Sequence, residues 1–246
     1  MSLMSHYDQF APFYDTVMGD RRDIIAIIHE AVGRHHPTST SLLELGCGTG
    51  SIMAGFADTF ELTGIDQSAN MLQIAQHKLP TATLHQGTIA GFELHHQFDV
   101  IICVFDTLNH LTDFSDWRKL FASAKKHLRS NGLFIFDMNT IGRLQALTAI
   151  PRYVQNFKTG TMEMIIEPVS PGEVVWHVVI QEPGSDGAIQ VYEERVHEAS
   201  FPLVEVVAEL QTHFNLLEHF DSHGAAPTDR SDRVYFVCQV SSSANA

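Results

Sequence analysis

The sequence predicts an α/β fold: a Rossmann-like sheet, mostly parallel and seven-stranded, with an antiparallel β meander inserted late in the chain. Two observations carry this prediction. Up to about residue 141, short apolar runs alternate with segments of helical periodicity, which is typical of parallel α/β sheets. Between residues 142 and 200, β-rich runs follow one another with turn residues between them and no helical pattern. A length of 246 residues suffices for a large buried core in one or two domains.

The first half of the chain shows the alternation clearly. In the segment from Asp20 to His36, isoleucine, alanine and valine recur at helical spacing. Ser68 suits the N-cap of a helix that Pro80 would end. The expected elements are short helical turns at 7–15, a helix at 20–36, a strand at 41–45, a helix at 52–60, a strand at 62–65, a helix at 68–79 and a strand at 83–85.

The second half begins with the nearly continuous apolar run 98–105, typical of a central parallel strand that is covered on both faces. Ser115 could cap the next helix, which Gly132 would stop. The remaining expected elements are a strand at 133–136, meander strands at 162–167, 174–180 and 189–197, a helix at 202–214, strands at 215–220 and 234–240, and a disordered tail at 241–246.

Composition narrows the classes of partner. The formal net charge of −14 repels phosphate backbones, so we expect no nucleic acid partner. No apolar run approaches the roughly 20 residues of a membrane helix, and no signal peptide fits the first thirty residues, so the expected location is cytoplasmic. Three scattered cysteines and the loop histidines at 35–36 and 95–96 lack metal-site spacing, so no metal is expected.

A glycine motif is the most informative feature. Gly46, Gly48 and Gly50 follow the first strand with G-x-G-x-G spacing, which differs from the G-x-G-x-x-G fingerprint of dinucleotide-binding proteins. Asp66 ends the second strand, where an acidic side chain can accept hydrogen bonds from both ribose hydroxyls. Asp66 alone fits NAD as well as S-adenosylmethionine (SAM). The glycine spacing and Glu44, two residues before the first glycine, favour SAM.

These motifs resemble those of the class I SAM-dependent methyltransferases. The matching stretches include 42–51, 64–72, 98–101 and 128–137. The segments Phe10-Ala11-Pro12-Phe13-Tyr14-Asp15 and Phe105-Asp106-Thr107-Leu108-Asn109-His110-Leu111 are similar to those of a small-molecule branch that includes the dTDP-amino-sugar N,N-dimethyltransferases. The resemblance implies that 1–141 and 201–246 form a SAM-binding methyltransferase domain. It also implies that 142–200 form an inserted antiparallel subdomain, acting as a lid or in a homodimer.

The resemblance implies roles for residues at the matching positions. Tyr14 could cover the methionine end of SAM, or simply pack the N-terminal segment. Where the family usually has Gly-Asp after the third strand, this chain has Gly87-Thr88, so a threonine replaces the acid that meets the adenine. The implied cofactor-binding residues are Glu44, Gly46, Cys47, Gly48, Gly50, Asp66, Gln67, Met71, Gly87, Thr88 and Val104.

The acceptor is expected beyond the carboxyl ends of the strands. His110 is the first candidate for a base or orienting group, since it follows the fourth strand, although a surface histidine fits as well. Asp106 and Asp137 could bind a cationic amine, or cap a helix and end a strand. Asn139 and Trp176 complete the expected substrate side, with packing in the inserted sheet the simpler role for Trp176.

The expected function is methyl transfer from SAM to a small polar molecule, foremost at an amine nitrogen. Nucleic-acid amino-methyltransferases with a similar fold carry a proline pair after the fourth strand, whereas residues 105–108 contain no proline. The alternatives are O-methylation of a small metabolite, a catalytically silent SAM-binding module and an NAD-dependent reductase.

Overall fold

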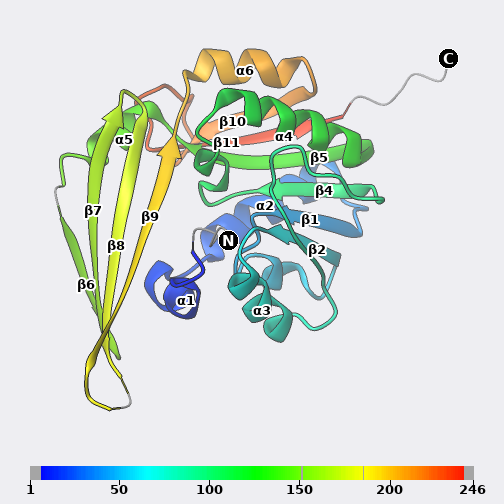
Figure 1. Cartoon of the computed structure of the whole chain (residues 1–246). Coiled ribbons are helices and arrows are strands. Elements are labelled where there is room, and N and C mark those ends of the chain that lie inside the picture. The colour runs from blue at the N-terminus through cyan, green and yellow to red at the C-terminus, as the bar shows by residue number, and fades with distance from the viewer. Residues whose placement is uncertain (1–6, 151, 185, 241–246) are drawn as a thin grey trace.

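The computed structural model describes residues 7–150, 152–184 and 186–240, which form two sheets beside each other (Figure 1). The larger sheet has the strand order β10-β11-β5-β4-β1-β2-β3. Its pairs are parallel except around β11, which runs antiparallel to both β5 and β10. The predicted mostly parallel, seven-stranded sheet is thus confirmed. Its strands are β1 (Ser41–Leu45), β2 (Glu61–Asp66), β3 (Thr83–Gln86), β4 (Phe98–Cys103), β5 (Leu128–Asn139), β10 (Asn215–Asp221) and β11 (Arg233–Gln239).

Helices cover both faces of this sheet, which explains the continuous apolar run of β4. Ile101 and Cys103 pack on the side of α4 (Phe114–His127) and α6 (Leu203–Gln211). Val100 and Ile102 pack on the opposite side, with α2 (Arg22–His35). All six residues of β4 are buried, as a strand between two helical layers must be. The helix α3 (Ala69–Lys78) follows β2, and its predicted N-cap is confirmed because Ser68 Oγ accepts the Met71 N–H.

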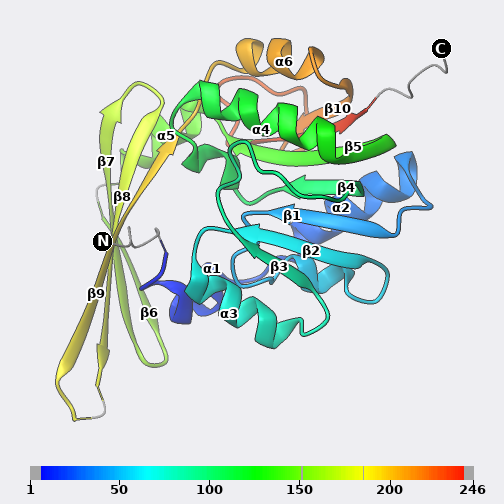
Figure 2. The same ribbon diagram turned by 45° about the vertical axis from the view of Figure 1, so that its right-hand side comes forward.

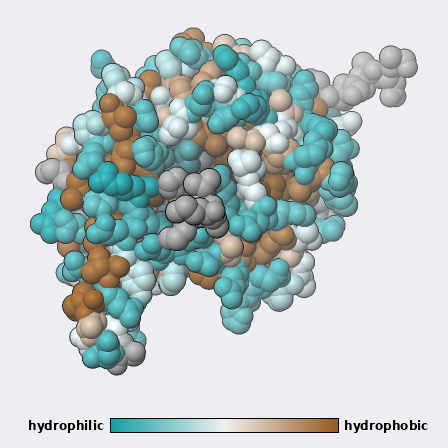
Figure 3. All heavy atoms as spheres, in the orientation of Figure 1, coloured by the Kyte–Doolittle hydropathy of each residue, from teal (hydrophilic) through white to brown (hydrophobic). Residues whose placement is uncertain are grey.

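The smaller sheet is the predicted antiparallel meander, with one strand more than expected (Figure 2). Its strands are β6 (Tyr153–Phe157), β7 (Gly160–Ser170), β8 (Glu173–Pro183) and β9 (Ile189–Ala199). Strand β6 was not predicted because its side chains are largely exposed and lack alternation. Brown, hydrophobic spheres are visible at the left of Figure 3, on the side of this sheet. The exposed large apolar side chains of the sheet include Tyr153, Val154, Val169, Ile189 and Val191.

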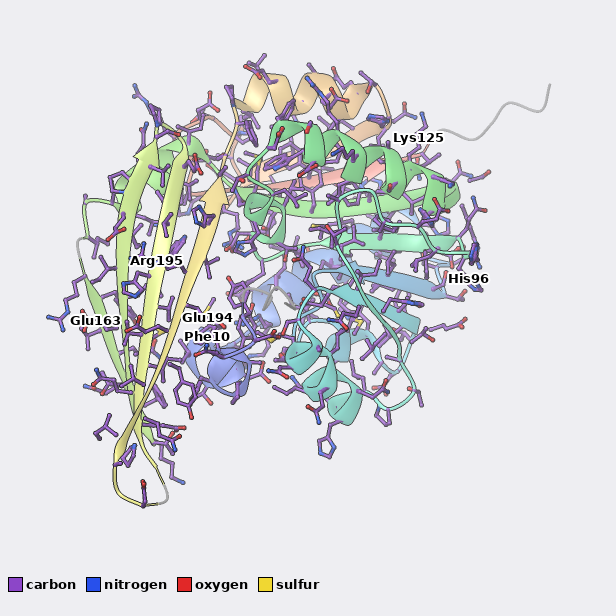
Figure 4. The ribbon with its side chains drawn as sticks, in the orientation of Figure 1. Phe10, His96, Lys125, Glu163, Glu194 and Arg195 are labelled. Atoms are coloured by element: carbon purple, nitrogen blue, oxygen red, sulfur yellow. The ribbon has the colours of Figure 1, made fainter. Side chains whose placement is uncertain are left out.

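The N-terminal segment packs between the two sheets. It contains the turn η1 (Ala11–Phe13) and the short helix α1 (Tyr14–Met18), as predicted. Phe10, Phe13 and Val17 share an apolar cluster with Met162 and Val178 of the smaller sheet. Figure 4 shows Phe10 beside Glu194 of β9, whose carboxylate accepts backbone hydrogen bonds from Tyr7, Gln9 and Phe10.

Four expectations about local structure were wrong. The helix expected at 52–60 is a single 3-10 turn, η2 (Met53–Phe56). The N-cap of α4 is Asp113 and not Ser115. The Asp113 carboxylate accepts the Ser115 N–H. Gly132 lies inside β5, because the chain extends directly from Leu128 after α4.

The fourth error concerns the start of the insertion. Residues 142–200 are not free of helix, since α5 (Ile141–Leu147) extends into them. Thr140 caps it by accepting the Arg143 N–H, and Leu144 and Leu147 pack against Ile166 and Val174. No helix in the described parts of the chain is both long and apolar enough to span a bilayer. The tail at 241–246 lies outside the described residues.

Candidate functional site

The glycine turn after β1 folds back onto the end of β2. The N–H groups of Gly46 and Cys47 both donate to the Ile65 carbonyl, at 2.8 and 3.0 Å. The N–H of Gly48 donates to Asp66 Oδ2 at 2.8 Å. Gly46, Gly48 and Gly50 all have positive φ, between 51° and 72°, which L side chains rarely adopt. A Cβ at position 46 would also lie 2.3 Å from Thr107 Cγ2, so the turn depends on glycine there.

A cavity of about 140 Å³ lies over this turn, at the carboxyl ends of the parallel strands. This is where ligands bind in open α/β sheets. The N-terminal segment and β9 also contribute to its wall, so residues far apart in sequence close over the glycine turn. The lining residues are Tyr7, Tyr14, Met18, Gly46, Gly48, Asp66, Gln67, Met71, Ile89, Phe105, Asp106, Thr107, His110, Leu111, Val196 and His197.

The structure brings together eight of the residues singled out from the sequence: Tyr14, Gly46, Gly48, Asp66, Gln67, Met71, Asp106 and His110 all line this cavity. Glu44, Cys47, Gly50, Gly87, Thr88 and Val104 do not. Thr88 is exposed, and its hydroxyl accepts the Ala90 N–H. The buried neighbour Ile89 lines the cavity in its place. At this place the wall of the cavity is therefore apolar.

Glu44 and Cys47 lie beneath the turn. The Glu44 carboxyl is 2% exposed and accepts the Met53 N–H at 3.1 Å. Burial raises the pKa of Glu44 to about 8. Burial likewise holds the pKa of the Cys47 thiol well above its usual value, so this thiol stays protonated and unreactive.

Arg21 is a buried cation beside the cavity that the sequence reading missed. It is 6% exposed, and its guanidinium carbon lies 4.0 Å from the centre of the Phe105 ring. Nη1 donates to the carbonyls of Met18 and Gly19, at 2.6 and 2.9 Å. Nη2 is buried and has no hydrogen-bond partner in the structure. Because an unsatisfied buried donor of a charged group is costly, this nitrogen is suited to an anionic ligand group.

Asp66 is held in place from both sides. Its Oδ1 accepts the Ser68 N–H and its Oδ2 accepts the Gly48 N–H, each at 2.8 Å. Burial raises the pKa of Asp66 above its usual value, while these hydrogen bonds favour the ionised form. The carboxylate therefore faces the cavity in a fixed orientation.

The loop after β4 adopts an uncommon backbone conformation. Phe105 and Asp106 both have positive φ, at 63° and 56°, although neither is glycine. Asp137 of β5 stabilises it by accepting both N–H groups, at 2.8 and 2.7 Å. Arg233 of β11 pairs with Asp106 at 2.5 Å and with Asp137 at 3.2 Å. Non-glycine residues in this region cost free energy and tend to cluster at functional sites.

Asp137 is fully buried and does not line the cavity. Because its oxygens already bind the loop and Arg233, it positions Asp106 and does not present a carboxylate to a substrate. This corrects the expectation that Asp137 binds a cationic amine directly.

His110 lies at the wall of the cavity near Tyr7. Its Nδ1 is 3.2 Å from the His197 carbonyl, which can only accept, so Nδ1 carries the proton. Its Nε2 lies 3.3 Å from the Tyr7 hydroxyl. Burial holds the pKa of Tyr7 well above its usual value, so the phenol keeps its proton and can donate to Nε2. The ring nitrogen Nε2 of His110, the candidate base, thus contacts Tyr7, a residue that the sequence did not single out.

A second cavity, of about 190 Å³, adjoins the first. Asn139 and Trp176, both expected near the substrate, line this cavity and not the first one. The indole nitrogen of Trp176 is buried without a hydrogen-bond partner. The residues common to both cavities are Tyr7, Met18, Phe105, Asp106 and Val196.

Comparison with known proteins gives three findings. Residues 42–132 match the family model described as a methyltransferase domain. The chain is 31% identical over 134 residues to a dTDP-3-amino-3,6-dideoxy-alpha-D-glucopyranose N,N-dimethyltransferase of Streptomyces fradiae, covering 52% of this chain and 52% of that enzyme. The match thus spans about half of that relative.

Solved structures are similar over almost the full length. A SAM-dependent methyltransferase of Clostridium acetobutylicum superposes with a TM-score of 0.85 at 20% identity, covering 96% of this chain and 99% of the other. A sugar N-methyltransferase of Streptoalloteichus superposes with a TM-score of 0.77 at 19% identity, covering 98% and 95%. At these identities the likeness concerns the fold, including the second sheet.

Proposed function

The chain belongs to the class I SAM-dependent methyltransferases, and on that premise we propose that it methylates an amine nitrogen of a small polar molecule. The cofactor is SAM. When bound, it supplies a methyl group on a sulfonium, so that the nitrogen–carbon bond forms as the sulfur–carbon bond breaks and sulfur keeps the electron pair. The residues of this chain contribute binding, orientation and the handling of the acceptor's proton.

The residues around the first cavity fit the cofactor. The orphaned Nη2 of Arg21 would pair with the carboxylate at its methionine end. Gly48 lines the cavity, and a Cβ there would meet no protein atom closer than Tyr14 at 3.9 Å, so the space over the turn is free for a ligand. Asp66 would accept hydrogen bonds from the ribose, and Gln67, Met71 and Ile89 would border the adenine. Glu44, under the turn, would favour the ammonium of the methionine end.

The observation that carries the choice of acceptor is the position of Asp106. It lines both cavities, so a molecule in the second one meets a carboxylate where it approaches the first. A carboxylate there attracts a cationic amine. The N-terminal segment and β9 cover the cofactor cavity, which leaves room for a small acceptor. The net charge of −14 further disfavours a nucleic acid.

The inserted sheet is proposed to act as a lid, which the presence of Val196 and His197 of β9 in the cavity wall supports. The division into domains 1–141 with 201–246 and 142–200, the homodimer and the cytoplasmic location stay predictions from the sequence.

Radiolabelled SAM incubated with the protein and a metabolite extract tests the function. The label is expected in a small cationic molecule, identified by mass spectrometry. An Asp106→Asn variant should transfer much less label, whereas Asp58→Asn, at an exposed site, should match the unmodified protein. Label found only in protein or RNA would overturn the proposal of a small acceptor, and label on an oxygen would favour O-methylation assisted by His110.

A further inference from the structure

A cluster of titratable side chains lies where the two cavities share Asp106, and one of its members comes from the inserted sheet. Glu198 of β9 is 3% exposed, and Asn139 Nδ2 donates to its Oε2 at 3.2 Å. Polar side-chain atoms of Asp106, His110 and Glu198 all lie within 4.8 Å of one another. Glu198 lines the second cavity, as does Arg233, the ion-pair partner of Asp106. No sequence motif points to Glu198, because only the fold brings β9 to the end of β4.

Acidic side chains outnumber the arginine in this group. Polar side-chain atoms of Glu198 and Asp106 lie within 4.8 Å of each other, and Asp137 and Arg233 both contact Asp106. Burial and the nearby Asp106 raise the pKa of Glu198 well above its usual value. Three carboxyls thus lie around Arg233 and His110, and a protonated amine placed among them would favour their ionised form.

The rest of the second cavity suits a ring-shaped apolar body. Phe10, Met164, Trp176 and Val178 form an apolar part of its lining. The Trp176 ring offers a flat face, and its buried indole N–H has no partner, so it is available to an acceptor oxygen or nitrogen.

We propose that the second cavity holds the methyl acceptor and that Glu198, with Asp106, binds its protonated amine at the boundary with the cofactor cavity. This inference rests on the proposed amine methylation and adds the residue that recognises the amine. The expected ligand class is a primary or secondary amine carried by a compact ring. Glu198 thereby acts as a specificity-determining residue that the inserted sheet supplies to the methyltransferase domain.

The same pair accounts for the proton that the amine must lose. An ammonium has no lone pair and cannot attack a methyl group. The bound ammonium gives one proton to a carboxylate oxygen of the pair, which leaves a neutral amine and a neutral carboxyl, with charge and atoms balanced. Because the pKa of Glu198 is raised, its carboxylate, once ionised beside the ammonium, accepts a proton more readily than that of an exposed glutamate would.

Binding of simple probes to the full chain loaded with S-adenosylhomocysteine tests the inference without relying on methylation. Benzylamine and its neutral counterpart benzyl alcohol are titrated near pH 7 by calorimetry or ligand-observed NMR. We expect the amine to bind at least about tenfold more tightly than the alcohol, the preference a charge-assisted hydrogen bond gives. Glu198→Gln should remove that preference and leave alcohol binding and S-adenosylhomocysteine affinity unchanged.

Two further variants serve as controls. Glu193→Gln makes the same change on the same strand, at a side chain that is 63% exposed, and should bind both probes like the unmodified protein. Trp176→Ala should weaken both probes together, since it removes the apolar wall.

Several outcomes would overturn the inference. They are equal affinity for amine and alcohol, no binding of either probe, an amine preference that survives Glu198→Gln, or amine binding that is abolished by EDTA and restored by a divalent metal. A methyl label on oxygen would instead contradict the proposed function while leaving this binding result intact, so the two failures are distinguishable.

Discussion

The carboxylate of Asp137 holds the backbone of Asp106, whose N–H donates to Asp137 Oδ1 at 2.7 Å. The other oxygen, Oδ2, accepts the Phe105 N–H and pairs with Arg233. Two consecutive positive φ angles are thus held by a buried carboxylate that is itself paired with an arginine. The position of Asp106 between the two cavities depends on a side chain that touches neither.

Asp137→Asn should destabilise the protein, because an amide can replace only one accepting oxygen and leaves Arg233 with less compensation. Breaking a buried ion pair by changing one partner costs about 3 to 5 kcal/mol. Urea denaturation should show a loss of about 3 kcal/mol or more in the free energy of unfolding. Asp58→Asn, at an exposed position, should change it by less than about 0.5 kcal/mol. Equal stability of the two variants would contradict the assigned role.

Gly48→Ala should reduce the free energy of S-adenosylhomocysteine binding by more than it reduces the free energy of unfolding. The positive φ of 51° imposes a strain of about 1 to 2 kcal/mol on any L side chain, and the new Cβ would project toward the ligand space. Gly187→Ala is the matched control, since φ there is 80° and no atom lies within 4 Å of the added Cβ. Calorimetry should find affinity reduced only in the first variant. If both variants bound S-adenosylhomocysteine with similar affinity, Gly48 would be needed only for the conformation of the turn.

Binding of SAM should release protons near pH 7. Burial raises the pKa of Glu44 to about 8 in the free protein, so its carboxyl is largely protonated at neutral pH. The ammonium of the cofactor would favour the ionised form, so affinity should rise with pH up to about 8, by at most tenfold per unit. Calorimetry in buffers of different ionisation enthalpy measures the released protons. Glu44→Gln should release none, and equal release by both proteins would remove Glu44 from the site.

The raised pKa of Glu44 also affects the stability of the protein, which should fall with rising pH whereas cofactor affinity should rise. A carboxyl whose pKa is raised on folding binds more protons in the native state than in the unfolded state. Its contribution is therefore present below its ordinary pKa and is lost as the pH rises toward about 8. Relative to Glu44→Gln, the unmodified protein should become less stable between about pH 5 and 8 in denaturant titrations. If the difference in free energy of unfolding between the unmodified protein and Glu44→Gln stayed constant across that range, it would contradict the burial of an ionisable Glu44.

Asp66→Ala should weaken SAM binding by about 1.5 to 3 kcal/mol, the range for hydrogen bonds to a charged group. Part of the loss would come from the turn itself, because Asp66 also accepts the Gly48 N–H. Asp66→Asn, which keeps one accepting oxygen, should lose less. Unchanged affinity in Asp66→Ala, measured by calorimetry, would refute the assignment.

The glycine turn, Asp66 and most strands of the larger sheet could be predicted from sequence because each is encoded locally. Apolar runs define strands, glycines permit positive φ, and an acidic residue at a strand end faces the site. Tyr7 and Glu198 line the cavities and Arg21 packs on Phe105 beside them. None of the three could be predicted, since each is placed there by packing between distant segments. The role expected for Asp137 failed for the same reason: its partner Arg233 is 96 residues away in sequence.

The most direct test of the account is the position of the transferred methyl group. SAM carrying a ¹³C-labelled methyl group is incubated with the protein and an extract fraction of small amines, and heteronuclear NMR of the purified product identifies the atom that bears the label. We expect a methyl group on nitrogen, with turnover that falls sharply in Glu198→Gln and persists in Glu193→Gln. A methyl group on oxygen or carbon, or incorporation confined to macromolecules, would contradict it.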